Sequence, residues 1–453
     1  MLRENPEQTG QDDMFRSRLA SIIDMGHELA RLAGLVEWDA LARDLAGFYC
    51  ADNGRPGSSI RLMAGLCFLK DLRGLSDEEV CAQWRENAYF QYFCGEEYLQ
   101  HRLPVEPPSL SIFRKRIGAK GAERLLAETV KLGLKTGTVT KNEIEKVNVD
   151  TTVQEKAIRF PTDTQLCHKA REELVKAAAR YDVPLRQTYV RKSKRAVFLA
   201  NRYMAARQVK RGRKMIKTVR NYLGRVIRGI ERAGEKTPHL QGAFRAELAK
   251  ARTIFAQTLN PQAADKLYSW HAPETECIAK GKAHKKYEFG CKASIASTNK
   301  SNFIIGAMAH HGKPYDGHTL RAVLEQVERL TGIKPREANA DLGYRGHGIV
   351  KEDSGCEVIL SRQKRGMTPA KRKRQRRRAA IEPIIGHCKN DRKVGPRNWL
   401  GGKQGDCINA IAIAIGFNLR KIFKKIFLWL LAKSLSWQSL TSPAHLQPVC
   451  GVY

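Results

Sequence analysis

The sequence at positions 147–150 reads Val147-Asn148-Val149-Asp150, so a β-strand here places its two valines on one face and its polar side chains on the other. A second strand pattern, Glu337–Asp341, also ends at an acid and runs directly into Leu342-Gly343-Tyr344. An acid at a strand end beside a glycine turn is poorly placed to pack a core, but it is well placed to hold a hard divalent cation. These two segments therefore predict a β-sheet with paired carboxylates at one edge.

A third acid, Glu382, lies in the segment 379–390, which we expect to be a helix. Arg378 precedes Glu382 by one helical turn and Lys389 follows it by two, so the three charged side chains share one helix face. Three acids around two divalent ions suit phosphodiester chemistry, because one ion activates the attacking oxygen and the other stabilises the leaving oxygen. The expected catalytic and metal-binding residues are Asp150, Asp341 and Glu382.

An ordinary structural role is also open for each acid. Asp150 and Asp341 would then be strand-end or turn acids, and Glu382 with Lys389 would be an exposed pair that stabilises the helix by only ~0.3 kcal/mol. The apolar residues of the same segment favour a helix that is half buried, so its charged stripe borders a cleft. These residues are Ile381, Ile384 and Ile385.

From about residue 140 onward, strand patterns alternate with helix patterns. Further strands are expected at 286–297, 303–310 and 357–361, and an amphipathic helix at 319–331. An acid-bearing strand, two more strands, a helix, a second acid-bearing strand and a later helix with Glu382 follow the ribonuclease-H-like order. We therefore expect an α/β fold with a ribonuclease-H-like catalytic domain.

The long interval between the first two acids departs from that order. Residues 168–259 carry almost no strand pattern, and residues 196–232 form a long, basic helical stretch. The run from 191 to 220 contains twelve Lys or Arg and no acid. We interpret the interval as a helical insertion between the first and second strands of the sheet, which would supply non-specific affinity for DNA.

The N-terminal region is expected to be all-helical. Ser76-Asp77-Glu78-Glu79 is a capping box that opens one helix, and Pro107-Pro108-Ser109 is expected to cap a second, basic helix. Two helices in this order suit a DNA reader of the helix-turn-helix type, and they suit an ordinary helical bundle equally well.

The charge balance points to a polyanionic partner. The chain has 453 residues with 80 Lys and Arg against 46 Asp and Glu, a formal net charge of +34. A membrane surface would also attract this charge, but the most apolar stretch, residues 407–432, is interrupted by polar and charged residues and lacks the roughly twenty uncharged residues of a span. Interfacial association through residues 426–431 is the remaining membrane alternative.

The eleven cysteines include no Cys-x-x-Cys pair, which favours reduced thiols in a cytoplasmic protein. We expect no membrane partner.

The ordered motifs resemble the DDE transposases of bacterial insertion sequences, and most closely insertion-sequence family five. The Arg-x3-Glu-x6-Lys motif of the wider group stands here as Arg378, Glu382 and Lys389, although the tyrosine often found three residues before the arginine is replaced by Gln375. The resemblance also includes residues 150–152, 160–164, 287–292 and 340–346, and it covers most of residues 57–420.

The resemblance implies an enzyme that binds the terminal inverted repeats of its element, cleaves DNA by metal-dependent hydrolysis, and joins the freed 3′-OH to target DNA. It implies two Mg²⁺ ions, for which Mn²⁺ would substitute, and a homodimer or higher oligomer on DNA. Two alternatives remain open: a metal-dependent nuclease without strand transfer, and a DNA-binding protein derived from a transposase that no longer catalyses the reaction.

The expected DNA contacts lie in four regions of the chain. Arg378 and Lys389 are assigned to phosphates of the substrate strand, and Tyr344 could stack on an exposed base. The other candidates are Arg114, Lys115, Arg116, Lys210, Arg211, Arg213, Lys214 and Arg345.

The expected domain boundaries follow these patterns. A helical domain occupies 1–135, the first part of the catalytic domain 136–167, the insertion 168–265, the rest of the catalytic domain with C-terminal helices 266–432, and a flexible tail 433–453.

Overall fold

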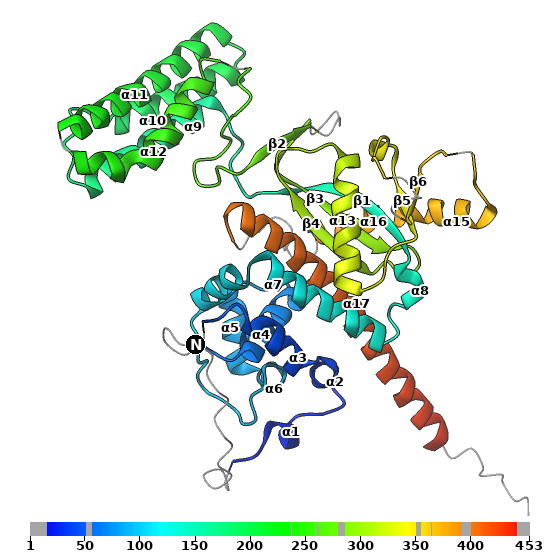
Figure 1. Ribbon diagram of the computed structural model, residues 1–453. Helices are drawn as coiled ribbons and strands as arrows, with labels where there is room; N and C mark the ends of the chain where they lie inside the picture. Colours follow the sequence, from blue (N-terminus) through cyan, green and yellow to red (C-terminus); the bar gives the residue numbers. More distant parts are fainter. Residues whose placement is uncertain are drawn as a thin grey trace, which may run out of the picture. The chain divides into compact units, whose positions relative to one another are not determined.

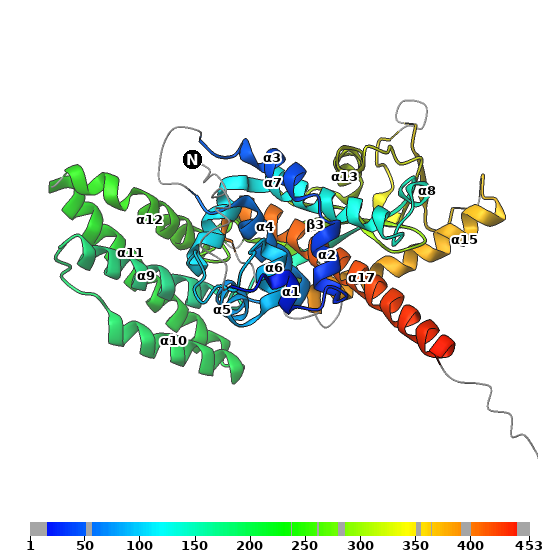
Figure 2. The same cartoon turned by 90° about the horizontal axis from the view of Figure 1, so that it is seen from below.

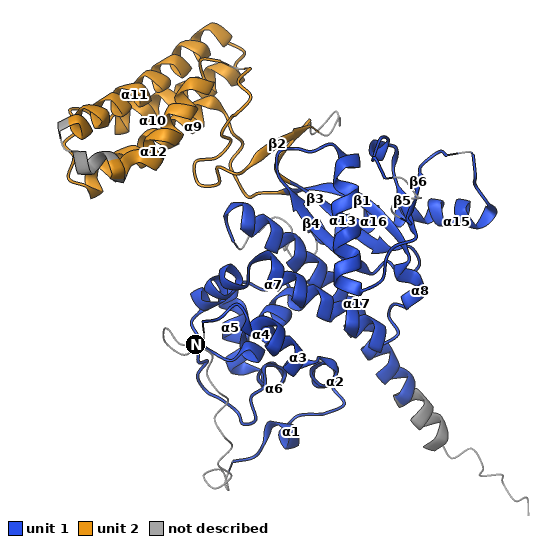
Figure 3. Ribbon diagram, in the orientation of Figure 1, with its two compact units in different colours: residues 1–154, 292–453 blue, residues 155–291 orange. Residues whose placement is uncertain are grey.

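The computed structural model describes residues 16–50, 57–236, 238–260, 262–279, 286–349, 355–363, 365–390 and 400–441. The chain divides into two compact units (Figure 3). Unit 1 contains residues 1–154 and 292–453, and unit 2 contains residues 155–291.

Unit 1 begins with a group of helices (Figure 1). These are α1 (Leu19–Ile22), α2 (Glu28–Leu35), α3 (Trp38–Ala46), α4 (Ile60–Arg73), α5 (Asp77–Glu86), α6 (Ala88–Cys94), α7 (Pro107–Lys135) and α8 (Lys141–Ile144). The capping box predicted at Ser76 is confirmed, since its hydroxyl accepts from Glu79 N–H and the Glu79 carboxylate accepts from Ser76 N–H. The cap predicted at Ser109 is wrong: α7 begins with its two prolines after Glu106, because proline needs no N–H partner in a first turn.

The last helix of unit 1, α17 (Gly402–Thr441), packs against α4, α7 and the sheet strand β4 (Ile304–His310), as Figures 1 and 2 show. Asn418 fixes this packing, because its buried amide donates to Ile304 C=O at 2.7 Å and to Thr129 Oγ1 at 3.1 Å while accepting from Ile304 N–H at 3.0 Å. The N-terminal helices and the sheet therefore share one hydrophobic core.

The structure corrects two expectations for this region. The apolar stretch 407–432, expected to belong to C-terminal helices, lies within one continuous helix, and this helix extends into the expected tail as far as Thr441. The rest of that tail lies outside the described residues. Among the described helices, none is long and apolar enough to cross a membrane.

The sheet has the strand order β2-β3-β1-β5-β6, and β4 pairs with β3 (Figure 1). Its other strands are β1 (Lys146–Glu155), β2 (Glu276–Ala279), β3 (Tyr287–Thr298), β5 (Glu337–Ala340) and β6 (Glu357–Leu360). β5 is parallel to both β1 and β6, whereas β4 is antiparallel to β3. The predicted strands and the α/β class are confirmed, except that β1 continues to Glu155 and does not end at Asp150.

The pairing of β1 with β3 follows from the hydrogen bonds at its two ends. Lys156 N–H donates to Phe289 C=O at one end, and Asn299 N–H donates to Lys146 C=O at the other, so the two strands run antiparallel. The remaining elements of unit 1 are α13 (Asp316–Thr331), η1 (Leu342–Tyr344), α15 (Pro369–Arg377), η2 (Arg378–Ala380) and α16 (Ile381–Asn390). The helix predicted over 379–390 is confirmed, with a short 3₁₀ turn at its start.

Unit 2 is mainly a bundle of four helices, α9 (Asp163–Arg180), α10 (Val190–Ala205), α11 (Val209–Lys236) and α12 (Pro238–Gln257). α11 packs against each of the other three, and the bundle has its own core, which includes Leu174, Leu223 and Ile254. The helical character predicted for residues 168–259 is confirmed. The basic side chains of α11 lie outside this core.

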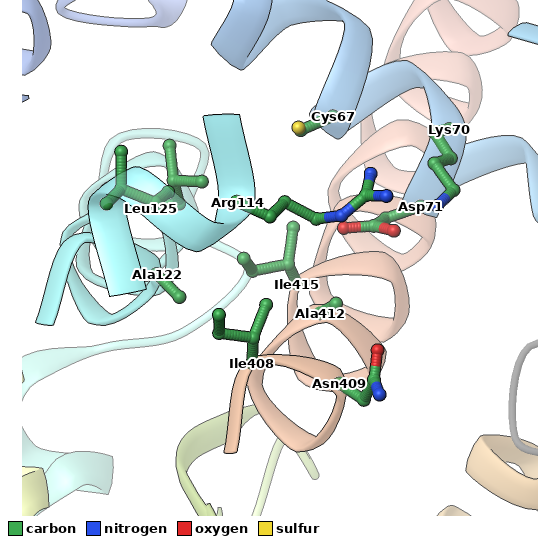
Figure 4. A pocket seen from close by; sticks show the side chains of 11 residues that line it. Cys67, Lys70, Asp71, Arg114, Ala122, Leu125, Ile408, Asn409, Ala412 and Ile415 are labelled. Atoms are coloured by element: carbon green, nitrogen blue, oxygen red, sulfur yellow. The ribbon is translucent and has the colours of Figure 1, made fainter. Parts of the chain in front are cut away.

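A buried ion cluster joins α4, α5 and α7. Asp77 accepts two hydrogen bonds from Arg114, at 2.6 and 3.0 Å, and lies 2.8 Å from Lys70 Nζ. Figure 4 shows Arg114 and Lys70 beside Asp71 in a small cavity of about 30 Å³ that α17 also lines. Burial raises the pKa of Asp71 to about 7.

Because Arg114 is buried and both of its terminal nitrogens bind Asp77, it is a structural residue. This corrects its assignment to DNA.

We expect Asp77→Ala to lower the free energy of unfolding by about 3–5 kcal/mol, because it leaves two buried cations without their carboxylate. Denaturant unfolding followed by circular dichroism measures this loss. Lys115→Ala, at an exposed position one residue after Arg114, is the control and should leave stability unchanged. An Asp77→Ala protein as stable as the wild type would contradict the assignment of Arg114 to the core.

Candidate active site

Two carboxylates meet at the carboxyl end of β5 because β1 and β5 are parallel and in register. Asn148 lies opposite Asn339, so Asp150 follows two residues later within β1, Asp341 follows directly after β5, and both face the same side. Asp341 caps η1, where its Oδ1 accepts from Gly343 N–H at 2.8 Å. Asp150 Oδ1 accepts from Thr151 N–H at 2.8 Å. The structure therefore brings the first two predicted acids together.

The environment of Asp150 disfavours its charged form. Burial raises its pKa to about 6, and the negative charges of Asp341 and Asp316 act in the same direction, against Thr151 N–H and the guanidinium of Arg378. A divalent cation between the two carboxylates would remove this repulsion. Carboxylate oxygens are also the ligands that Mg²⁺ and Mn²⁺ prefer, so the residues present fit such an ion.

Glu382 lies on the far side of Arg378 from Asp150. Arg378 Nη1 is 3.5 Å from Asp150 Oδ2, and its Nη2 is 3.9 Å from Glu382 Oε1. The Glu382 side chain is 69% exposed, whereas that of Asp150 is 16% exposed. Within the described part of the chain, no three His, Cys, Asp or Glu side chains lie close enough together to hold a metal ion. The Arg378 guanidinium therefore lies between Asp150 and Glu382, the first and third of the predicted metal-binding acids.

Asp316 and Lys292 also belong to this region, although the sequence did not single out either for the site. Asp316 Oδ1 accepts from Lys292 Nζ at 2.8 Å and from Thr151 Oγ1 at 2.9 Å. An acid in the first turn of a helix has an ordinary interpretation, because it complements the helix dipole. The position of Asp316 in the sequence therefore did not distinguish a site residue from an ordinary first-turn acid.

Tyr344 is fully buried, so its predicted stacking on an exposed base is wrong for this conformation. Its hydroxyl is buried and makes no hydrogen bond of ordinary geometry within the described residues. Burial raises the pKa of Tyr344, and the charges of Asp150, Asp316 and Asp341 raise it further, so the phenol lies close to the acids and stays neutral. The adjacent Arg345 is exposed.

The other basic candidates occupy two separate surfaces. Lys115 and Arg116 are exposed on α7 of unit 1, where Arg116 lies 4.6 Å from the centre of the Tyr49 ring. Four more cations are exposed near the start of α11 in unit 2. These are Lys210, Arg211, Arg213 and Lys214. All of these side chains are accessible to a polyanion, unlike Arg114.

We expect Asp150→Asn to stabilise the metal-free protein above pH 6. Because the pKa of Asp150 is raised from 3.8 to about 6 on folding, the folded chain holds this proton more tightly and loses stability as pH rises through that window. The neutral amide removes a cost on the order of 2 kcal/mol at pH 7–8 and should have little effect near pH 3.5.

Thermal unfolding in a chelating buffer across this pH range measures the gain. Asp44→Asn, which alters an exposed carboxylate of α3, is the matched control. Equal melting temperatures for Asp150→Asn and the wild type at pH 7.5 would show that Asp150 carries no electrostatic strain.

Comparison with known proteins gives three findings. A family model described as "Transposase domain (DUF772)" matches residues 17–116, and one described as "Transposase DDE domain" matches residues 266–403. The curated protein "Uncharacterized protein ORF8 in nfe locus" from Rhizobium meliloti is 46% identical over 207 residues, which are 46% of this chain and 100% of that protein. No solved structure matches the chain. The DDE match includes Asp341, Glu382 and Lys389.

Proposed function

Because this chain belongs to the DDE transposases of bacterial insertion sequences, we propose that it cleaves DNA at its element's ends and joins the freed 3′-OH to target DNA. The observation that carries the proposal is the meeting of Asp150 and Asp341 on adjacent parallel strands, next to Arg378 and Glu382. We propose its placement within insertion-sequence family five from the order and contexts of Asp150, Asp341 and Glu382, whereas the Arg378, Glu382 and Lys389 motif is that of the wider group.

The acids of the site are proposed to hold the divalent ions that DDE transposases use. Asp150 and Asp341 form the buried part of this donor set, and Glu382 completes it from α16. When bound, two Mg²⁺ or Mn²⁺ ions supply activation of the attacking oxygen and stabilisation of the leaving oxygen. The backbone N–H groups of Thr151 and Gly343 hold the two aspartates in fixed orientations throughout.

Arg378 and Lys389 are proposed to bind phosphates of the substrate strand. Arg378 offsets the charges of Asp150 and Glu382, and its planar guanidinium presents paired donors that match a phosphate. Lys389 lies two turns along from Glu382 on α16 and offers a single mobile charge. Arg345, exposed after η1, is proposed as a further contact to phosphate.

The strand order supports a ribonuclease-H-like catalytic domain. The path β4-β3-β1-β5-β6 combines antiparallel strands on one side of β1 with parallel strands on the other. This order places Asp150 on the central strand and Asp341 after its parallel neighbour. We propose that the N-terminal helices bind element ends and that α11 of unit 2 binds the DNA backbone. We also propose that the active protein is a homodimer or higher oligomer on DNA.

The proposal predicts that Asp150→Ala, Asp341→Ala and Glu382→Ala each abolish cleavage. Labelled element-end DNA is incubated with each variant and Mg²⁺, and nicked and joined products are separated by electrophoresis. DNA binding, measured by mobility shift, should stay close to that of the wild type, because these acids do not contact phosphates. Cleavage retained by Asp341→Ala would remove that residue from the site. A wild-type protein that nicks DNA and never joins it would favour the nuclease alternative.

The exposed cations of α11 predict a salt-dependent, sequence-independent contribution to binding. Replacing Lys210, Arg211, Arg213 and Lys214 with Gln should weaken binding to all duplexes. A plot of the logarithm of the DNA association constant against the logarithm of the salt concentration should also become less steep, by about 0.9 for each phosphate that the variant no longer neutralises. Exchanging each Lys for Arg and each Arg for Lys keeps the charge and is the matched control. An unchanged slope in the Gln variant would assign this face to solvent or to a protein partner.

A further inference from the structure

The ion pair of Lys292 and Asp316 lies close to Asp150 and Asp341, and it has no role in the function proposed above. Lys292 of β3 donates to Asp316 Oδ1 at 2.8 Å, and Thr151 of β1 donates to the same oxygen at 2.9 Å. The Lys292 side chain is 15% exposed and that of Asp316 is 30% exposed, so the pair is largely shielded from water. One carboxylate oxygen of Asp316 therefore receives two donors from two different strands.

The start of α13 is held rigidly in place. Lys292 Nζ also donates to Pro314 C=O at 2.7 Å, just before the helix. Thr319 Oγ1 donates to Asp316 C=O at 2.7 Å and accepts from the buried hydroxyl of Ser294 at 3.2 Å. These contacts fix both the backbone and the carboxylate of Asp316 against β3.

The fixed carboxylate adjoins both aspartates of the site. Thr151, whose hydroxyl donates to Asp316, uses its own backbone N–H to hold Asp150 Oδ1. On the other side, a methyl group placed on Gly343 would lie 3.4 Å from Asp316 Oδ2 and 2.9 Å from Asp341 Oδ1. Asp316 thus borders the turn that orients Asp341 and fixes the residue that orients Asp150.

We propose that Asp316 is a positioning residue whose carboxylate, neutralised by Lys292, locks Thr151 and thereby aims Asp150 at the metal ion shared with Asp341. The inference rests on the proposed function, since it assumes that these two aspartates bind a divalent ion. Outer partners of metal-binding carboxylates commonly change metal affinity by about 10- to 100-fold when they are removed. Thr151 links Asp316 to Asp150 through its hydroxyl and its backbone N–H, so removal of this hydroxyl offers the sharpest test.

The experiment measures Mn²⁺ binding to the full-length protein by electron paramagnetic resonance, together with the Mn²⁺ dependence of DNA cleavage. Thr151→Val removes the hydroxyl and keeps the side-chain shape, and Thr151→Ser keeps the hydroxyl. We expect Thr151→Val to weaken Mn²⁺ binding by about 10-fold or more and to raise the half-saturating Mn²⁺ concentration equally. Thr151→Ser should bind Mn²⁺ as the wild type does. Similar affinities for the Val and Ser variants would overturn the proposal.

Asp316→Ala separates positioning from direct ligation. We expect its Mn²⁺ affinity to fall between those of the wild type and Asp341→Ala, and at a saturating Mn²⁺ concentration its cleavage should recover. If Asp316→Ala loses Mn²⁺ as completely as Asp341→Ala while Thr151→Val binds normally, Asp316 is itself a ligand and the positioning role is wrong. Melting temperatures in chelating buffer verify that each variant is folded.

The two readouts keep this inference separate from the proposed function. A wild-type protein that binds Mn²⁺ but neither nicks nor joins DNA would contradict the proposed function, and the Mn²⁺ affinities of the Val and Ser variants would still decide the role of Asp316. A wild-type protein that cleaves DNA, with a Thr151→Val variant of equal Mn²⁺ affinity, would contradict the inference alone.

Discussion

The register of the parallel pair β1 and β5 is the constraint from which the site follows. A slip of one residue would turn every side chain of one strand to the opposite face and separate Asp150 from Asp341. Two buried amides oppose such a slip. Asn148 of β1 accepts from Asn299 at 2.7 Å, and Asn339 of β5 donates across the pair to Val147 C=O at 3.4 Å. Each would lose its partner in another register, at a cost of about 1–3 kcal/mol for a buried polar group.

Cations offset the acids at both ends of β5. Near the site, Lys292 binds Asp316 at 2.8 Å and Arg378 lies 3.5 Å from Asp150, and at the opposite end of β5 Arg374 binds Glu337 through two hydrogen bonds at 2.6 and 2.7 Å. Charge-assisted and paired contacts of this kind are stronger than neutral hydrogen bonds. They keep the acids in place despite mutual repulsion, although the pKa of Asp150 shows that the compensation is incomplete.

Features with a strong local period could be predicted from the sequence. The alternation in β1 and the helical spacing around Glu382 each carry their own signal, so the strand, the helix and the order of the acids were accessible. Arg114 illustrates what was not. Its place in a basic run favoured DNA, and only the tertiary contact with Asp77 reveals it as a core residue. The burial of Tyr344 and the hydrogen bond from Lys292 to Asp316 likewise depend on contacts between residues far apart in the sequence. The periodicity of the sequence does not reveal such contacts.

The antiparallel neighbours β1 and β3 have a further consequence for how this chain is built. Lys156 and Phe289 are joined by a backbone hydrogen bond, so the polypeptide leaves the sheet and returns to it at adjacent positions. A short β-hairpin turn would connect the same two strands, and the helices α9 to α12 between them pack around a core of their own. The helical bundle is therefore an insertion into the connection between two neighbouring strands. A change in its length or sequence alters none of the residues that pair β1 with β5 and so set the register of the acids.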